Sequence, residues 1–131
     1  MAELFSEEWM SSFQLIWNED PELKDALAEI DFNSVIGYGF PDDDQATGYI
    51  DVQKGEIVSC GSYSGQELNW DIRAEPKNWN KWLSDGIGMA GLGTAFTFGK
   101  MKFKVGDYKS MLKDPRMAGP FIKSFGAMGK V

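Results

Sequence analysis

The sequence contains no histidine and only one cysteine, Cys60. Without histidine the chain lacks the commonest general base, the commonest nitrogen ligand for metals and every Ser-His or Cys-His nucleophile pair. One cysteine allows no disulfide within the chain, and zinc bound by His and Cys ligands is excluded. Catalysis would have to rest on carboxylates, tyrosines or lysines, and we predict no catalytic residue, no metal site and no cofactor.

Long apolar runs are also missing, since none approaches the roughly 18 residues that a membrane-spanning helix needs. The first nine residues, MAELFSEEW, are acidic and lack the apolar centre of a signal peptide. The last three residues, Gly129-Lys130-Val131, differ from the Ser-Lys-Leu type of peroxisomal signal. Together with a single cysteine, which fits a reducing compartment, these features predict a cytoplasmic location.

The 131 residues predict one domain, 1–131, with a single hydrophobic core. The net charge of −7 is unevenly distributed: residues 1–51 hold 13 acidic side chains against Lys24, whereas residues 100–131 hold 8 basic side chains against 2 acidic ones. No basic patch is interleaved with aromatic residues, so we expect no nucleic-acid partner. The basic third could face a membrane surface or the phosphates of coenzyme A. Alternatively, its lysines are a solvated face paired with the acidic N-terminal helices.

Capping and periodicity predict the elements that precede residue 86. Ser6 is a helix N-cap with Glu7 and Glu8 in the first turn, and Asp20-Pro21 begins a second helix. The following expected elements are strands over residues 32–40, 47–52, 57–61 and 68–74, then a helix from Glu75-Pro76. Lys54-Gly55 is the turn of a hairpin. Four strands in meander order predict an antiparallel sheet with one face against helices.

The most informative stretch is FGKMKFKVGDY, residues 98–108. Met101, Phe103 and Val105 alternate with lysines, as in a strand with one buried face. Gly106-Asp107 ends this strand, and a helix is expected from about Tyr108, with Met111 and Leu112 at helical spacing. Pro115 ends that helix, and a last amphipathic segment follows it.

This motif, and the order of elements around it, resembles the sterol carrier protein 2 (SCP2) family. The resemblance implies an α+β, SCP2-like fold: a five-stranded, mainly antiparallel sheet covered on one face by helices, with C-terminal helices closing a hydrophobic tunnel. It also implies non-catalytic binding and transfer of a hydrophobic ligand, such as a fatty acid, a fatty acyl-CoA or a sterol-like molecule. The segment around Gly119-Pro120 would act as a lid, with Gly126 and Gly129 loosening its end.

Glycine and methionine are concentrated beside this motif. Gly86 to Gly91 matches the pattern GxGxxG, but no strand precedes it, and Met111 stands where an acidic residue would bind ribose. We therefore interpret it as an apolar loop or short helix. Five of the seven methionines lie in the last 43 residues, where they suit an adaptable pocket or an ordinary core. The predicted ligand-binding residues, taken from element position in the resemblance, are Trp82, Ile87, Met89, Leu92, Phe96, Phe98, Met101, Phe103, Met117, Phe121 and Phe125.

Three alternatives stay open. A ketosteroid-isomerase-type enzyme would use Asp51 or Asp71 as base with Tyr38 or Tyr49 as donor, although neither carboxylate is predicted to be buried. An accessory subunit of a catabolic enzyme would pack the C-terminal apolar stripe on a partner. The carboxylates of Asp42–Asp44 could suggest a metal site, but a charged turn is favoured. The sequence does not indicate the oligomeric state.

Overall fold

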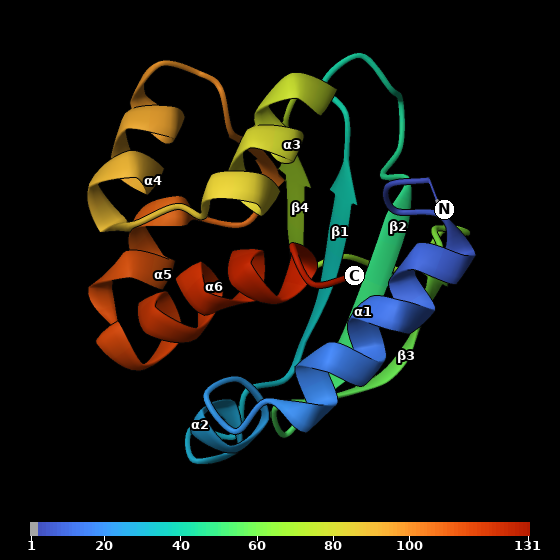
Figure 1. Ribbon diagram of the computed structural model, residues 1–131, viewed down its shortest axis with the longest axis vertical. Coiled ribbons are helices and arrows are strands. Elements are labelled where there is room, and N and C mark those ends of the chain that lie inside the picture. The colour runs from blue at the N-terminus through green and yellow to red at the C-terminus, as the bar shows by residue number, and fades with distance from the viewer. Residues whose placement is uncertain (1–2) are drawn as a thin grey trace.

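The computed structural model describes residues 3–131, without the side chains of Met111 and Leu112. Its elements, in chain order, are α1 (Glu7–Glu19), α2 (Lys24–Ala28), β1 (Ser34–Gly39), β2 (Gly48–Gln53), β3 (Glu56–Ser62), β4 (Trp70–Arg73), α3 (Pro76–Asp85), α4 (Met89–Thr97), β5 (Lys102–Val105), α5 (Tyr108–Lys113) and α6 (Pro115–Met128). The helices gather on one side of the sheet, with α1 and α6 lying across it in Figure 1. The expected α+β architecture with one covered face is confirmed.

The five strands lie in the order β3-β2-β1-β4-β5. β1 pairs parallel with β4, and the other three pairings are antiparallel. The meander prediction is therefore wrong for β4, because the chain crosses from β3 to the free edge of β1. Asn69 fixes this return, since its backbone N–H donates to the carbonyl oxygen of Val35 at 2.9 Å and its Oδ1 accepts from the Val35 N–H at 2.8 Å.

The hairpin between β2 and β3 turns at Lys54-Gly55, as predicted. Both residues have positive φ, +50° and +82°, the backbone of a tight turn whose twist matches that of the strands. Gly55 is required for a second reason, because a Cβ there would collide with the backbone oxygen of Lys24, the first residue of α2. The Trp17 indole N–H donates to the Gly55 carbonyl at 2.8 Å, which ties α1 to the hairpin.

Helix boundaries follow the capping signals with one shift. The Ser6 hydroxyl accepts from the Trp9 N–H at 3.2 Å, so α1 begins as predicted. The Asp20 carboxylate caps the Glu22 N–H as predicted, but residues 21–23 form a turn and the regular second helix begins at Lys24 instead of Pro21. α6 continues through Pro120 as one helix.

The core lies between the covered face of the sheet and the helices. Alternation along β1 places Ile36 and Tyr38 on that face, and β4 adds Ile72. α6 packs against α1, α2, α3 and α5. This arrangement leaves the centre of α6 facing β1 and β4, where the candidate site lies.

Candidate functional site

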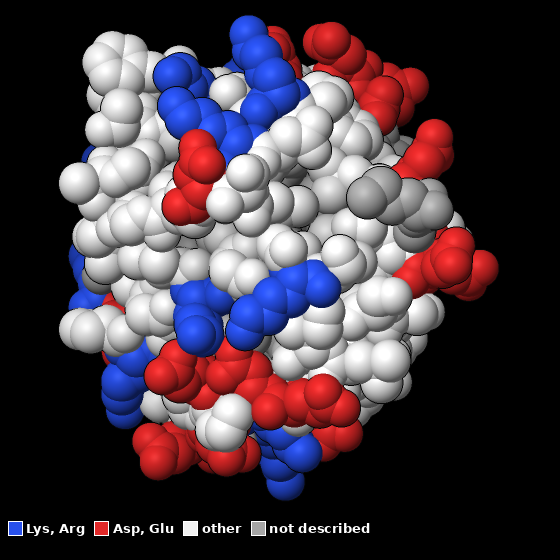
Figure 2. Space-filling view, in the orientation of Figure 1, with Lys and Arg blue, Asp and Glu red and all other residues white. Residues whose placement is uncertain are grey.

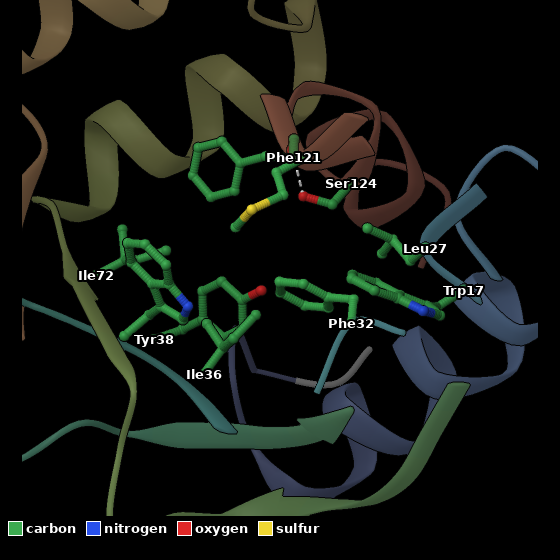
Figure 3. Close-up of a pocket in the computed structure, with 10 residues that line it drawn as sticks. Trp17, Leu27, Phe32, Ile36, Tyr38, Ile72, Phe121 and Ser124 are labelled. Carbon is green, nitrogen blue, oxygen red and sulfur yellow. Dashed lines mark hydrogen bonds between the residues drawn. The ribbon is translucent and has the colours of Figure 1, made fainter. Parts of the chain in front are cut away.

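An apolar cavity lies between α6 and strands β1 and β4. Its volume is about 30 Å³. It is lined by Trp17, Leu27, Phe32, Ile36, Tyr38, Trp70, Ile72, Met117, Phe121 and Ser124, most of which are labelled in Figure 3. No charged side chain of the described residues lines it.

Helix α6 and strands β1 and β4 supply most of the wall, with Trp70 and Ile72 coming from β4. On α6, Met117, Phe121 and Ser124 recur at spacings of four and three, so they share one helix face. On β1, Ile36 and Tyr38 alternate with glycine, and both side chains line the cavity (Figure 3). The cavity is therefore bounded by the strand floor and by the face of one helix above it.

Two hydroxyl groups are the polar features of this wall. The Ser124 hydroxyl donates to the Phe121 carbonyl within α6 at 2.5 Å. Tyr38 is 1% exposed, and burial raises the pKa of its phenol well above the ordinary range. The Tyr38 oxygen points into the cavity, on the side where Phe32 lies (Figure 3). The cavity wall is thus apolar, with the protonated hydroxyl of Tyr38 facing the enclosed space.

The predicted ligand-binding residues fall into separate groups. Met117 and Phe121 line the cavity. Phe103 and Phe125 contact Phe121 through their rings, with centroids 6.3 and 5.2 Å away, and Phe96 contacts Phe103 at 6.2 Å. The structure thus joins four predicted residues in one aromatic cluster that reaches the cavity at Phe121.

The other predicted residues lie away from the cavity. Trp82 and Ile87 border an open groove between α3 and α4, together with Lys81 and Lys100. Leu92 and Met101 are buried in the core, whereas Met89 and Phe98 are 50% and 74% exposed. Their role in binding stays a prediction.

Most of the cavity wall was not among the predicted residues. These lining residues are Trp17, Leu27, Phe32, Ile36, Tyr38, Trp70, Ile72 and Ser124. The alternation along β1 and β4 does place several of them on the covered face, but the same pattern describes a filled core. Ser124 indicates the cavity more specifically than the strand alternation does, because it is a small polar residue on the apolar face of α6.

Asp71 is buried, which corrects the expectation that it lies on an exposed strand face. It is 6% exposed and forms a two-armed ion pair with Arg73, which is 1% exposed. The other guanidinium nitrogen of Arg73, Nη1, donates to the carbonyl oxygens of Phe40 and Asp43 at 3.0 and 2.8 Å, so residues 40–47 cover this face. Gly37, opposite Asp71 on β1, leaves room for that covering chain.

The carboxylates considered for an enzyme are not brought to the cavity. Asp71 points to the face of the sheet opposite Tyr38, because Ile72 is the residue paired with Tyr38. Asp51 accepts a hydrogen bond from Gln53 near the hairpin turn, and the Tyr49 hydroxyl pairs with Ser59. Neither carboxylate forms a hydrogen bond with Tyr38 or Tyr49 in the described structure, and neither lines the cavity.

Charges of opposite sign meet where α6 passes the turn between α1 and α2. The Lys123 Nζ lies 2.9 Å from the Glu22 carboxylate. Lys123 lowers the pKa of Glu22 through a hydrogen bond and its charge, and Glu22 raises the pKa of Lys123. Acidic side chains gather at this end of the molecule, with basic side chains directly beside them (Figure 2). Lys123 thus pairs with the acidic N-terminal part, which is one of the two alternatives expected for the basic residues near the C-terminus.

Residues 3–131 lack two further features. No cluster of three or more Cys, Asp or Glu side chains with the geometry of a metal site occurs there, the Asp42–Asp44 turn included. Within the same residues, no helix has the length and apolar character needed to cross a membrane.

The arrangement of sheet and helices defines the sterol carrier protein 2 fold. A crystal structure of sterol carrier protein 2 superimposes with a TM-score of 0.77 at 17% identity, over 98% of this chain and 99% of that chain. A solution structure of a protein from Thermus thermophilus, described as a possible sterol carrier protein, gives 0.71 at 18% identity over 96% and 90%. The ubiquinone synthesis protein UbiJ-SCP2 gives 0.59 at 13% identity over 91% and 90%.

These likenesses confirm the SCP2 fold and extend along nearly the whole chain. At such low identities they show the fold alone. No protein-family model and no curated protein matches the amino-acid sequence.

Proposed function

We propose that this domain binds a hydrophobic ligand, without catalysing a reaction, in the cavity between α6 and strands β1 and β4. The observation that carries the proposal is the cavity wall itself, which is apolar apart from two hydroxyl groups and two indole N–H groups that bond elsewhere, and contains no charged side chain of the described residues. Mostly apolar walls with a few placed polar groups are typical of small-molecule sites. The sterol carrier protein fold agrees with this use of the cavity.

Binding requires the cavity to enlarge. Its volume of about 30 Å³ suffices for a water molecule, whereas ligand pockets commonly measure roughly 300–1,000 Å³. Burial of a sixteen-carbon chain at roughly 0.8 kcal/mol per methylene gives a gross gain on the order of 10 kcal/mol. Such a gain can offset the outward movement of one helix and the entropic cost of association.

α6 is the element that would move. It forms the roof of the cavity and packs against α1, α2, α3 and α5, and its Phe121 ring also contacts Phe103 of β5. Its link to the turn between α1 and α2 includes the exposed Glu22–Lys123 ion pair, which water screens and which therefore separates at low cost. We propose that residues 115–131 act as a lid, with ligand release following its opening.

The class of ligand is a finer part of the proposal. The names of two structural neighbours refer to sterol carriers, and that of the third refers to ubiquinone synthesis. A fatty acid, a fatty acyl-CoA or a sterol-like molecule fits the apolar wall. For a coenzyme A thioester, the α3–α4 groove with Lys81 and Lys100 would supply positive charge for the phosphates. We further propose that the protein works in the cytoplasm.

An accessory role beside an enzyme is the second candidate. It is favoured by the exposure of Phe98 and Met89, which places two large apolar side chains at the two ends of α4. A contact there would leave the cavity free to present its ligand to a partner. Transient docking on a membrane surface through the neighbouring Lys100 and Lys102 is the related possibility.

Native mass spectrometry of the purified protein tests the proposal, followed by solvent extraction of any bound molecule. A one-to-one complex with a lipid or acyl-CoA would support it and identify the chemical class. If the protein is ligand-free, it should bind a sixteen-carbon lipid supplied in excess. Failure to bind any such lipid would contradict ligand carriage and favour the accessory role.

A further inference from the structure

Tyr38 is held rigidly at the floor of the cavity. Its ring stacks on Phe5, with centroids 5.5 Å apart and planes at 21°, and meets the edges of Phe13 and Trp79 at 6.2 and 6.1 Å. β1 occupies the centre of the sheet, so the backbone of Tyr38 is fixed on both sides by β2 and β4. The position of the hydroxyl group is therefore set by packing before any ligand arrives.

This hydroxyl forms no hydrogen bond with another described residue, although Tyr38 is 1% exposed. Figure 3 shows the oxygen pointing into the cavity, with no dashed line to a neighbour. Because every fully enclosed side-chain nitrogen or oxygen of the described residues has a partner, the open side of this oxygen is the cavity itself. Burial raises the pKa of the phenol, so the group stays protonated and acts as a donor near neutral pH. Since no described residue accepts from this donor, a ligand acceptor placed in the cavity can form a hydrogen bond with it.

No residue that the structure describes brings a positive charge to the cavity wall to balance an anion. Arg73 lies on the opposite face of the sheet and is paired with Asp71. Lys123 is paired with Glu22 at the surface of α6. The Ser124 hydroxyl already donates to the Phe121 carbonyl. A carboxylate brought into this cavity would lose its hydration and receive at most one hydrogen bond, which is a costly exchange.

We infer that the Tyr38 hydroxyl is the specificity-determining donor of the cavity. It selects apolar ligands that carry one uncharged oxygen acceptor, such as an alcohol, ketone or ester, over ligands that must bury a carboxylate. The inference rests on the proposed function, since it names the ligand class of the same cavity. The oxygen of the ligand lies at Tyr38, and the hydrocarbon part lies between Ile36, Ile72 and Phe121.

Displacement of the neutral dye Nile red by sixteen-carbon ligands, delivered from methyl-β-cyclodextrin at pH 8.5, tests the inference. The four ligands are hexadecan-1-ol, methyl hexadecanoate, hexadecanoate and hexadecane. We expect the alcohol and the ester to bind at least about tenfold more tightly than the ionised acid. Tyr38→Phe should weaken the alcohol and the ester by about three- to tenfold, the range for one hydrogen bond, and leave hexadecane within about twofold.

Tyr49→Phe is the matched control, because it removes a tyrosine hydroxyl that pairs with Ser59 on the other face of the sheet. It should leave all four affinities unchanged. If the wild-type protein binds alcohol and acid equally, or if Tyr38→Phe changes no affinity, the inference is wrong while lipid binding stands. If none of the four ligands displaces the dye, the proposed function itself is contradicted.

Discussion

The Asp71 carboxylate and the Arg73 guanidinium, two residues apart on β4, form a buried two-armed ion pair with N–O distances of 2.6 and 2.9 Å. The pair lies on the face of the sheet away from the cavity. Because Arg73 also donates to two carbonyl oxygens of residues 40–43, it holds the acidic loop 40–47 against β1 and β4. The buried guanidinium of Arg73 thus has a counterion and four hydrogen bonds, and its role is structural.

Replacing Asp71 by Asn should therefore destabilise the protein strongly. The substitution leaves the guanidinium of Arg73 buried without its counterion, which typically costs about 3–5 kcal/mol. Urea unfolding monitored by tryptophan fluorescence measures the free energy of unfolding. Asp51→Asn is the control, since that half-buried carboxylate bonds only Gln53 among the described residues, and it should cost less than about 0.5 kcal/mol. Equal effects of the two variants would contradict a stabilising role for the Asp71–Arg73 pair.

The burial of Asp71 could not be predicted from the sequence. Alternation of Trp70 and Ile72 with Asp71 and Arg73 correctly predicts a strand with two chemically distinct faces. It wrongly predicts that the polar face is wet, because the covering loop 40–47 comes from more than 20 residues earlier in the chain. The same local pattern fits a parallel or an antiparallel neighbour, so the sequence did not predict the parallel pairing of β4 with β1.

Local signals with a stereochemical cause were predictable. The Ser6 cap, the Lys54-Gly55 turn and the strand around Phe103 depend on a few neighbouring residues, and all three are present. The cavity is different, because its wall combines α1, α2, β1, β4 and α6. Apolar periodicity identifies buried faces, but whether two buried faces meet in full contact depends on side chains from distant segments.

The Glu22–Lys123 ion pair should make the stability of the contact between α6 and the α1–α2 turn depend on pH. The pKa of Glu22 is lowered from its ordinary value of 4.5, so its contribution is present above that value and is lost as the pH falls through the lower folded value. The raised pKa of Lys123 gives a contribution that is present below 10.5 and is lost only at higher pH.

Urea midpoints of the wild type and Glu22→Gln, measured from pH 3 to pH 7, check this expectation. The difference between the two proteins should be largest above about pH 5 and should shrink toward pH 3. Added salt should also reduce it, because both side chains are solvent-exposed. Glu29→Gln, at an exposed carboxylate just after α2, is the control. A difference that is constant across the pH range would contradict the ion pair's role.

Two glycines near the end of α6 should respond in opposite directions to the same substitution. A Cβ at Gly126 meets no atom within 4 Å, so Gly126→Ala should stabilise the helix by about 0.5–1 kcal/mol. A Cβ at Gly129 would collide with the carbonyl oxygen of Leu83 in α3, so Gly129→Ala should destabilise the protein. Thermal unfolding of both variants measures the two signs.

This contrast refines the expectation that Gly126 and Gly129 both loosen the end of the lid. Gly129 permits close contact between the end of α6 and α3, whereas at Gly126, inside α6, a Cβ would meet no neighbouring atom. If both substitutions stabilise the protein, the close approach to Leu83 is not required for the fold.

Filling the cavity from α6 separates ligand binding from folding. Ser124 is 2% exposed and lines the cavity, so Ser124→Leu places larger apolar volume on the side where the ligand would lie. The introduced volume should lower the affinity for a sixteen-carbon alcohol at least about tenfold, while overpacking costs about 1–3 kcal/mol of stability. Ser124→Ala is the matched control: it removes the hydroxyl that bonds Phe121 and leaves the volume open, so binding should persist.

Nile red displacement and urea unfolding of the same preparations give the affinity and the stability independently. If Ser124→Leu is folded and binds the alcohol as tightly as Ser124→Ala does, then the ligand does not occupy the space beneath α6, and the site must be sought elsewhere, first in the α3–α4 groove beside Trp82 and Ile87.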